Sequence, residues 1–560
     1  MTGWALDLGT TNSGVARWDD ARGQPQLVDL PAICRKPAGR EPLEAPRLIP
    51  SAVHLIENPG LFDRLGAWPP VARRFFLGRQ AYIGRPALEH NYGVARASFV
   101  PTFKPALSSE PLLTLARVGG RSVTAREAAQ TFLRELLVEI KRHTGHRLRE
   151  LVVTSPVTAF ESYRAEVQEI LRRLGLRRVR FVDEPVAAAL GYGLNLTEDR
   201  TVLVVDIGGG TMHVVLVRLS PQGAMSGQAL VLAKRGHTVG GNAVDGWILA
   251  DLCREAGAAA PAEGDDEGTR LWRRLMLSEA CRVKEAVFFD ESATFLLTPP
   301  GVNTLDGART PGGGFLGFSR ERLTRVLEEN GFLRYLTAAL DEVIEQAGVP
   351  SDVISDVLLV GGSTLLPGVF PLLEARFERR RLRAWQPFEA VAYGAACFAA
   401  DRVAAVDFIV HDYAFVTHDA KTGATQHVVI VPRGTRFPTK PDFWKRQLVP
   451  TCALGEPETI FKLVVCEVSR ADGGARKFVW DAAGDLHKIG GEGGEGEMVV
   501  PLNAASPMLG YLDPPHSPRD RRPRLEVAFG VNRERWLTAT VRDLLNQREL
   551  MREEPVVRLL

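Results

Sequence analysis

One pattern of residues occurs twice in this chain and limits the folds open to it. An apolar run ends at an aspartate, crosses a turn rich in glycine and hydroxyl side chains, and resumes as a second apolar run. The two copies are WALDLGTTNSGVA (4–16) and VVDIGGGTMHVV (204–215), and a third glycine turn, VLLVGGSTLLPG, spans 357–368. The repeat predicts a two-lobed, internally duplicated fold.

The same turns have a chemical interpretation. Glycines between two strands let backbone N–H groups converge on an anion, threonine hydroxyls add donors, and an aspartate holds Mg²⁺ through water. Any one of the turns, taken alone, is equally well explained as a tight hairpin turn. Two of them facing each other predict a clamp for the phosphates of a nucleotide.

Composition excludes several classes of protein. The 560 residues carry 69 Lys and Arg against 67 Asp and Glu, so the net charge of +2 attracts neither nucleic acid nor an anionic membrane. The basic runs at 172–180 and 376–383 are interpreted as solvated helix faces. The six cysteines are scattered without a CxxC pair, and the sequence shows neither a leader pattern nor a membrane-length apolar stretch. We expect a cytoplasmic protein that binds no nucleic acid and no membrane.

The texture of the chain changes near residue 400. Upstream, short apolar runs alternate with amphipathic helical stretches, which is typical of a layered α/β fold, and Thr124 with Glu127 predicts a capping box. Downstream, β-branched runs such as RLEVAFGV (524–531) predict a mainly β domain. The expected organisation is an α/β domain at 1–400, a linker at 401–412, a β domain at 413–545 and a short tail at 546–560.

Five segments resemble, in order and spacing, the heat-shock protein 70 (DnaK-type) chaperone family of the actin-like ATPase superfamily. The resemblance implies a two-lobed, duplicated actin-like ATPase fold followed by a mainly β, substrate-binding-like domain. DFIVHD, which begins at Asp407, resembles the family's interdomain linker, and the tail is too short for the family's helical lid. A divergent, lidless member is therefore expected. The five segments are LDLGTTNS (6–13), DEPVAAALGYGL (183–194), VVDIGGGT (204–211), VLLVGGST (357–364) and EAVAYGAA (389–396).

The resemblance implies roles for particular residues. Lys104 would contact the γ-phosphate and the attacking water, within a catalytic set completed by Glu184, Asp206 and Thr211. Asp7 and Asp206 would hold Mg²⁺ through water. From the residues alone, Lys104 is equally a surface lysine in a proline-rich loop. The implied nucleotide-binding positions are Gly9, Thr10, Thr11, Asn12, Gly208, Gly209, Gly210, Gly240, Gly241, Lys284, Gly361, Gly362 and Ser363.

A second implied group couples the nucleotide to the linker. Pro156 and Arg164, eight positions apart, match the pair that relays nucleotide state to the interdomain surface in the family. The third implied member is Asp407, which follows Val406 and is the first acid of the segment DFIVHD. Without the resemblance, the proline would be a strand stop and the arginine an exposed helix charge.

Several positions depart from the family pattern. Leu365 stands where the family commonly has an arginine stacked on adenine, and Cys281, Glu285 and Phe288 replace Glu, Arg and Ser on the adenosine helix. We expect altered adenine recognition. His213 replaces an aspartate that helps to bind a monovalent cation, and a histidine cannot supply that negative charge. We therefore expect weak or absent potassium dependence.

The leading hypothesis is a DnaK-type chaperone-like protein that binds ATP with Mg²⁺, hydrolyses it slowly to ADP, and couples this to polypeptide binding in the β domain. A J-domain co-chaperone and a nucleotide-exchange factor are the implied partners. The alternative is a nucleotide-sensing scaffold with little turnover that docks a dedicated protein partner. A sugar or acetate kinase of the same superfold would need an acceptor pocket and would lack the β domain.

Overall fold

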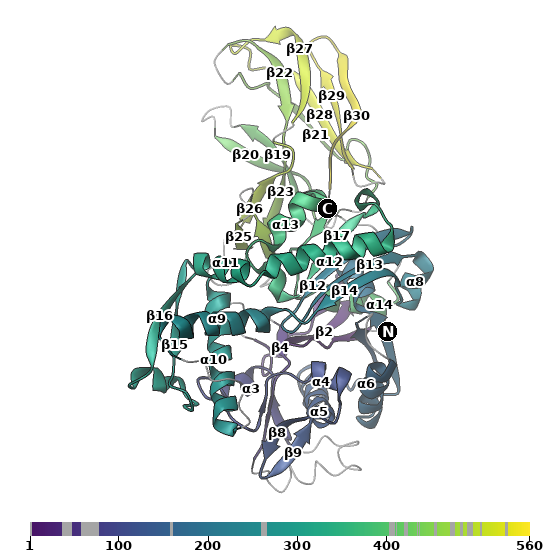
Figure 1. Ribbon diagram of the computed structural model, residues 1–560. Helices are drawn as coiled ribbons and strands as arrows, with labels where there is room; N and C mark the ends of the chain where they lie inside the picture. Colours follow the sequence, from purple (N-terminus) through teal and green to yellow (C-terminus); the bar gives the residue numbers. More distant parts are fainter. Residues whose placement is uncertain are drawn as a thin grey trace. The chain divides into compact units, whose positions relative to one another are not determined.

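The chain divides into two compact units, Met1–Ala405 (unit 1) and Val406–Leu560 (unit 2), which Figure 1 colours from purple to yellow. We describe each unit by itself. The computed structural model describes all residues except 1–2, 36–46, 58–77, 157–160, 259–265, 403–408, 410–411, 419–423, 434, 436, 453–455, 471–476, 482–484, 490–496, 505–506, 533–535 and 560.

Unit 1 contains two sheets of the same design. We call the part of unit 1 built on the first sheet lobe I and the part built on the second sheet lobe II. The strand order in lobe I is β11-β10-β1-β2-β3, with β4 also paired to β2, and the order in lobe II is β18-β17-β12-β13-β14. The bounds in lobe I are β1 (Trp4–Asp7), β2 (Asn12–Asp19), β3 (Gln24–Leu27), β4 (Leu48–Pro50), β10 (Glu150–Ser155) and β11 (Arg178–Asp183). Those in lobe II are β12 (Arg200–Ile207), β13 (Met212–Leu219), β14 (Leu230–His237), β17 (Asp356–Val360) and β18 (Leu382–Arg383).

Strand directions repeat as well as strand order. In lobe I, β1 pairs antiparallel with β2 and parallel with β10; in lobe II, β12 pairs antiparallel with β13 and parallel with β17. Asp7 ends β1, and Asp206 lies one residue before the end of β12. The predicted internal duplication is confirmed, and it places the two aspartates at corresponding positions.

Helices, 3₁₀ turns and shorter strands make up the rest of the described part of unit 1. The helices are α3 (Arg85–Glu89), α4 (Lys104–Ser109), α5 (Ala125–Thr144), α6 (Glu161–Arg173), α7 (Glu184–Gly191), α8 (Pro221–Ser226), α9 (Gly241–Glu255), α10 (Glu267–Ala286), α11 (Arg320–Glu329), α12 (Phe332–Ala347), α13 (Val369–Phe377) and α14 (Ala390–Ala399). The 3₁₀ turns are η1 (Leu305–Arg309), η2 (Ser351–Val353), η3 (Gly362–Leu365) and η4 (Arg379–Arg381). The remaining strands are β5 (Val53–Leu55), β6 (Ala81–Ile83), β7 (Phe99–Val100), β8 (Thr114–Val118), β9 (Arg121–Thr124), β15 (Ser292–Leu297) and β16 (Gly314–Ser319).

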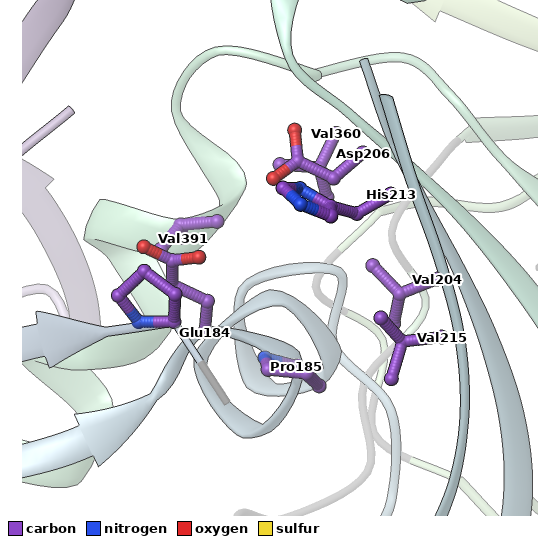
Figure 2. A pocket seen from close by; sticks show the side chains of 9 residues that line it. Glu184, Pro185, Val204, Asp206, His213, Val215, Val360 and Val391 are labelled. Carbon is purple, nitrogen blue, oxygen red and sulfur yellow. The ribbon is translucent and has the colours of Figure 1, made fainter. Parts of the chain in front are cut away.

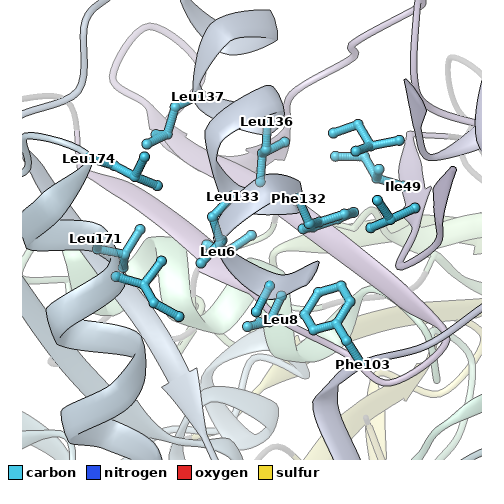
Figure 3. Packing of buried hydrophobic residues seen from close by; sticks show 14 of the residues in the cluster. Leu6, Leu8, Ile49, Phe103, Phe132, Leu133, Leu136, Leu137, Leu171 and Leu174 are labelled. Carbon is cyan, nitrogen blue, oxygen red and sulfur yellow. The ribbon is translucent and has the colours of Figure 1, made fainter. Parts of the chain in front are cut away.

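The core of lobe I lies between its sheet and α5. The predicted capping box is present: Thr124 accepts a hydrogen bond from the Glu127 N–H, and the Glu127 carboxylate caps the Thr124 N–H. Phe132 and Leu133 on the apolar face of α5 pack with Leu6 of β1, as Figure 3 shows. The helix therefore fixes the strand that carries Asp7. Among the described residues, no helix combines the length and the apolar character needed to cross a membrane.

In the described part of unit 2 every element is a strand, around a core that includes Phe461, Phe529 and Val541. One sheet has the order β20-β19-β23-β26 and another β21-β28-β29-β30. The segment 546–560, expected as a tail, contains the edge strand β30. The bounds are β19 (Asp412–His418), β20 (Thr425–Val431), β21 (Trp444–Leu448), β22 (Glu458–Leu463), β23 (Val465–Arg470), β24 (Lys477–Trp480), β25 (Leu486–Ile489), β26 (Glu497–Pro501), β27 (Met508–His516), β28 (Leu525–Val531), β29 (Trp536–Asp543) and β30 (Arg548–Arg558).

Candidate active site

Four charged residues from four elements of unit 1 form one electrostatic cluster. Lys104 begins α4 and Glu184 begins α7, and the Lys104 Nζ lies 3.1 Å from the Glu184 Oε1. Asp7 and Asp206 come from the ends of β1 and β12. Burial raises the pKa of Asp7 to about 6 and that of Asp206 to about 7; Glu184 adds to both shifts, and Lys104 opposes them. Three acids thus share one ammonium group.

Lys104 stays protonated although it is buried. Burial alone disfavours its charged form, but Glu184, Tyr163 and Asp7 outweigh that effect and raise the pKa of Lys104. The cluster therefore presents a permanent positive charge beside two carboxyls that titrate near neutrality. This combination suits the binding of a polyanion together with a divalent cation.

Close helix packing fixes the position of Glu184. A Cβ added to Gly191 of α7 would lie 1.7 Å from the Ala390 carbonyl oxygen, and one added to Gly394 of α14 would lie 1.7 Å from the Ala187 carbonyl oxygen. The two helices therefore contact each other through their backbones, which only glycine permits at these points. Two of the segments that carry the family resemblance thus pack against each other and hold the first residue of α7.

The turn between β1 and β2, residues 8–11, is the first of the two predicted phosphate loops. Ser51 donates a hydrogen bond to the Gly9 carbonyl oxygen at 2.7 Å, and Thr102 donates one to the Thr10 carbonyl oxygen at 2.8 Å. Asn12 accepts a hydrogen bond from the Arg35 Nε at 3.0 Å. With two of its carbonyl oxygens held by hydroxyl groups, this loop is pre-shaped before any ligand binds.

The turn between β12 and β13, residues 208–211, is the second predicted phosphate loop. Gly241 donates its N–H to the Gly208 carbonyl oxygen at 3.0 Å, and the Ser363 hydroxyl donates to the same oxygen at 3.0 Å. A Cβ added to Gly240 would lie 2.7 Å from that oxygen and 2.8 Å from the Thr211 nitrogen. The Gly240–Gly241 turn therefore packs directly on the loop.

The structure brings the two loops and the third glycine turn together. A Cβ on Gly209 would lie 3.0 Å from the Thr11 Oγ1, so the first loop reaches the second. A Cβ on Gly361, whose φ is 87°, would lie 2.9 Å from an Asp206 carboxylate oxygen. Gly210 has open space around it, and Gly362 starts the turn that carries Ser363. The loops, with two acids whose pKa is raised, fit a nucleotide phosphate chain with Mg²⁺.

The predicted base-recognition region on α10 contains a closed ion pair. The Lys284 Nζ lies 2.7 Å from the Asp245 Oδ1 of α9, and it donates to the Gly241 carbonyl oxygen at 3.2 Å. Both side chains are buried, and burial raises the pKa of Asp245 to about 6 against the influence of Lys284. Cys281 contacts Glu285 one turn along the same helix, and Leu365 is only 2% exposed.

A small cavity of about 30 Å³ lies under the charged cluster, enough for one or two water molecules. Glu184 and Pro185 line it from α7, while Asp206 and His213 line it from paired positions on β12 and β13, as Figure 2 shows. The His213 ring lies against Gly236 of β14, where a Cβ would approach the ring to 2.7 Å. Burial lowers the pKa of His213, so the imidazole is neutral at neutral pH.

The predicted coupling residues differ in what the structure describes. Arg164 donates to the Asp183 carboxylate at 2.6 Å and to the Ser155 hydroxyl at 3.0 Å, so it bridges the ends of β10 and β11. Asp183 directly precedes Glu184, and Pro156 lines the cavity. Asp407 lies outside the described residues.

Two residues of the cluster escaped the sequence analysis. Thr154 donates a hydrogen bond to the Asp7 carboxylate at 2.6 Å, from the neighbouring parallel strand. Tyr163 is buried beside the cluster, and its hydroxyl has no hydrogen-bond partner among the described residues. The hydroxyl pair at the end of LVVTS (151–155) was the available signal for the threonine, whereas the tyrosine gave none.

The fold and the site define a duplicated α/β nucleotide-binding unit followed by a β unit, and comparison with known proteins gives the family. The model of the Hsp70 protein family matches residues 94–467, well over half of the chain. The chain is 26% identical over 447 residues to the chaperone protein DnaK of Thermus thermophilus, covering 78% of this chain and 66% of that protein. It is 27% identical over 439 residues to the chaperone protein HscA homolog of Acidithiobacillus ferrooxidans, covering 77% and 64%.

The chain belongs to the Hsp70 family. The predicted fold class, a two-lobed actin-like ATPase fold followed by a β domain, is confirmed. The chain spans slightly less than two thirds of the length of the relatives described above.

Proposed function

We propose that this Hsp70-family chain binds ATP, hydrolyses it slowly, and couples hydrolysis to polypeptide binding in unit 2. The observation that carries the proposal is the cluster of Asp7, Lys104, Glu184 and Asp206, whose two aspartates stand where β1 and β12 enter the two predicted phosphate loops. A J-domain co-chaperone and a nucleotide-exchange factor are the partners that the proposal includes.

In this proposal each residue of the cluster has a separate task. Asp7 and Asp206 would hold Mg²⁺, which would supply positive charge to offset that of the phosphate oxygens. Lys104 donates hydrogen bonds to a γ-phosphate oxygen and to the attacking water. Glu184 fixes the ammonium group and accepts a hydrogen bond from that water, while the Thr211 hydroxyl donates to a phosphate oxygen. Positioning and charge neutralisation are the main demands of phosphoryl transfer.

Single-turnover hydrolysis of ATP tests the catalytic part. Lys104→Ala removes the ammonium group and should slow hydrolysis by about 100-fold or more, as is typical for loss of one preorganised donor. Lys141→Ala, which changes an exposed lysine near the end of α5, is the matched control. Equal rates in wild type and Lys104→Ala would remove Lys104 from the mechanism.

The coupling part has its own test. We expect ATP to accelerate the release of a fluorescent unfolded peptide from the full chain. Arg164→Ala should reduce that acceleration, because Arg164 connects Ser155 at the end of β10 to Asp183, the residue directly before Glu184. A rate of peptide release that is the same with and without ATP would contradict the coupling but not the proposed ATP hydrolysis.

One observation favours a second candidate, a nucleotide-sensing scaffold with little turnover. Neutral His213 lies beside Asp206 in the cavity, where the family resemblance implies an acid, so the site lacks one negative charge for a catalytic cation. Such a scaffold would bind ATP, show no affinity for model unfolded peptides, and dock one dedicated protein.

A further inference from the structure

A strongly basic region of the surface lies at one edge of lobe I. Two segments carry it, 141–149 (KRHTGHRLR) and 172–178 (RRLGLRR), and neither contains an acidic residue. All of their Lys, Arg and His side chains are exposed. We call these side chains together the basic surface. The net charge of the whole chain is only +2, so the excess of positive charge is local.

The fold brings the two segments together. α5 ends in the first segment and α6 in the second, and the two helices pack against each other (Figure 1). Beyond the helices, the N–H groups of Arg177 and Arg178 donate to the Arg149 carbonyl oxygen at 2.7 and 3.1 Å. Leu148 and Leu174 are buried in the core cluster of lobe I. The basic side chains are therefore carried on a firmly anchored backbone.

The basic surface does not belong to the candidate active site. β1 runs parallel with β10, and β10 runs parallel with β11. Asp7 is the last residue of β1, whereas Arg149 and Arg177 directly precede the first residues of β10 and β11. The arginines therefore lie at the amino ends of these strands, at the opposite edge of the sheet from the predicted phosphate loop.

Helix dipoles explain only part of this charge. Basic residues in the last turn of a helix offset the negative end of its dipole, which accounts for residues 141–143 and 172–173. Arg149, Arg177 and Arg178 lie outside any helix, and in the part of the chain that the structure describes they form no ion pair. Their charge is therefore available to a partner.

The chemistry of the basic surface favours carboxylate groups. Arg172 donates from its Nε and Nη2 to the two carboxylate oxygens of Glu169 at 2.8 and 3.0 Å, so a guanidinium of this surface already grips a carboxylate with two bonds. None of the large apolar side chains exposed in the described part of the chain belongs to the two segments. The surface therefore lacks groups that stack on nucleic acid bases or insert into a lipid bilayer.

We propose that the basic surface of lobe I docks an acidic polypeptide segment of a partner protein. Arg149, Arg177 and Arg178 bind its carboxylates. Because the contact is electrostatic and has no exposed apolar groups, the complex forms fast and weakens as the salt concentration rises. The proposal does not depend on ATP hydrolysis.

Fluorescence anisotropy with the full chain tests this, using labelled peptides of serine alternating with either glutamate or lysine. We expect the glutamate peptide to bind at least about tenfold more tightly than the lysine peptide, and the double variant Arg149→Glu and Arg177→Glu to weaken its binding by at least about tenfold. The matched control, Arg218→Glu and Arg270→Glu, changes exposed arginines of β13 and α10. It alters the net charge equally and should change the affinity by less than about twofold.

Circular dichroism checks that the variants fold. If the glutamate pair does not fold, Arg149→Gln with Arg177→Gln replaces it, and we expect this pair to weaken binding by at least about threefold because it removes the charge without reversing it.

The other outcomes overturn the proposal. No binding of the glutamate peptide, equal affinity for both peptides, or equal losses in the two double variants would make the basic surface a solvated face only. Tighter binding of double-stranded RNA or of phosphatidylserine vesicles than of the glutamate peptide would assign it to a phosphate-bearing partner. Self-association that the Arg149→Glu and Arg177→Glu variant loses, seen by sedimentation velocity without peptide binding, would assign it to a second copy of this chain.

Discussion

The phosphate side and the α10 side of the candidate site use their charges in opposite ways. On the phosphate side, three acids, Asp7, Asp206 and Glu184, interact with the ammonium group of Lys104, which is the one ammonium group in this cluster among the described residues, so negative charge is left for a ligand cation. On the α10 side, Lys284 is closed on Asp245 in a buried pair. In our proposal a ligand cation completes the charge balance of the phosphate side, whereas on the α10 side Lys284 and Asp245 already balance each other.

The largest expected effect is on the α10 side. Asp245→Ala leaves the Lys284 ammonium buried without its partner, which typically costs about 3–5 kcal/mol in the free energy of unfolding. Denaturant unfolding measures it. Asp341→Ala, which removes the exposed partner of Arg376, is the control and should cost less than about 1 kcal/mol. Equal losses of unfolding free energy in the two variants would mean that Asp245 does not balance the buried charge of Lys284.

Next comes the support of Asp7 on the phosphate side. Thr154→Val removes the hydroxyl that donates to the Asp7 carboxylate, a bond to a charged group worth about 1.5–3 kcal/mol. We expect the Mg²⁺ concentration for half-maximal ATP hydrolysis to rise by about 10- to 100-fold. The control is Thr324→Val, which removes a hydroxyl that donates to the Arg320 carbonyl oxygen within α11 and should leave the Mg²⁺ requirement unaltered. An unchanged Mg²⁺ requirement in Thr154→Val would separate Asp7 from the metal.

A smaller effect concerns potassium. His213→Asp adds a third carboxylate to the cavity beside Asp206 and Glu184, and a monovalent cation relieves the resulting repulsion. We expect hydrolysis by the variant to be stimulated several-fold when potassium replaces lithium, and His213→Asn to show no stimulation. Strong stimulation of the unmodified chain would defeat this account of His213.

The smallest expected effect is the release of protons when Mg²⁺–ATP binds. Because the pKa values of Asp7 and Asp206 are raised to about 6 and about 7, both acids are partly protonated near pH 6.5. A bound cation favours the carboxylate form, so Mg²⁺–ATP should release a fraction of a proton and bind more tightly as the pH rises through this window. Calorimetry in buffers of different ionisation enthalpy measures the release, which Asp206→Asn should reduce. Proton uptake on binding of Mg²⁺–ATP would contradict this expectation.

The sequence predicted the strands and loops of the phosphate side because their chemistry is local. An aspartate ending an apolar run, followed by glycines, specifies a strand and a turn within a dozen residues, and the repeat of this pattern indicates two lobes. The Thr124–Glu127 capping box is local in the same way and is present. These features depend on neighbours in the chain, which the sequence displays directly.

Partners from distant segments could not be predicted. Thr154 reaches Asp7 across 147 positions, through the pairing of parallel strands, and Asp245 meets Lys284 across the packing of α9 on α10. The basic surface of lobe I likewise needs the contact of Arg149 with Arg177, and the short segment after 545 did not indicate a strand as long as β30. Such contacts follow from the fold, which supplies information that spacing along the chain lacks.

Calorimetric titration of the chain with Mg²⁺–ATP and Mg²⁺–GTP tests the central claim most directly. If the phosphate side supplies the binding energy and the α10 side adds little selection, the two affinities should differ by less than about tenfold, and Asp206→Asn should weaken both equally. A preference for ATP of about 1,000-fold or more, or an Asp206→Asn variant that binds both nucleotides as wild type does, would contradict the account.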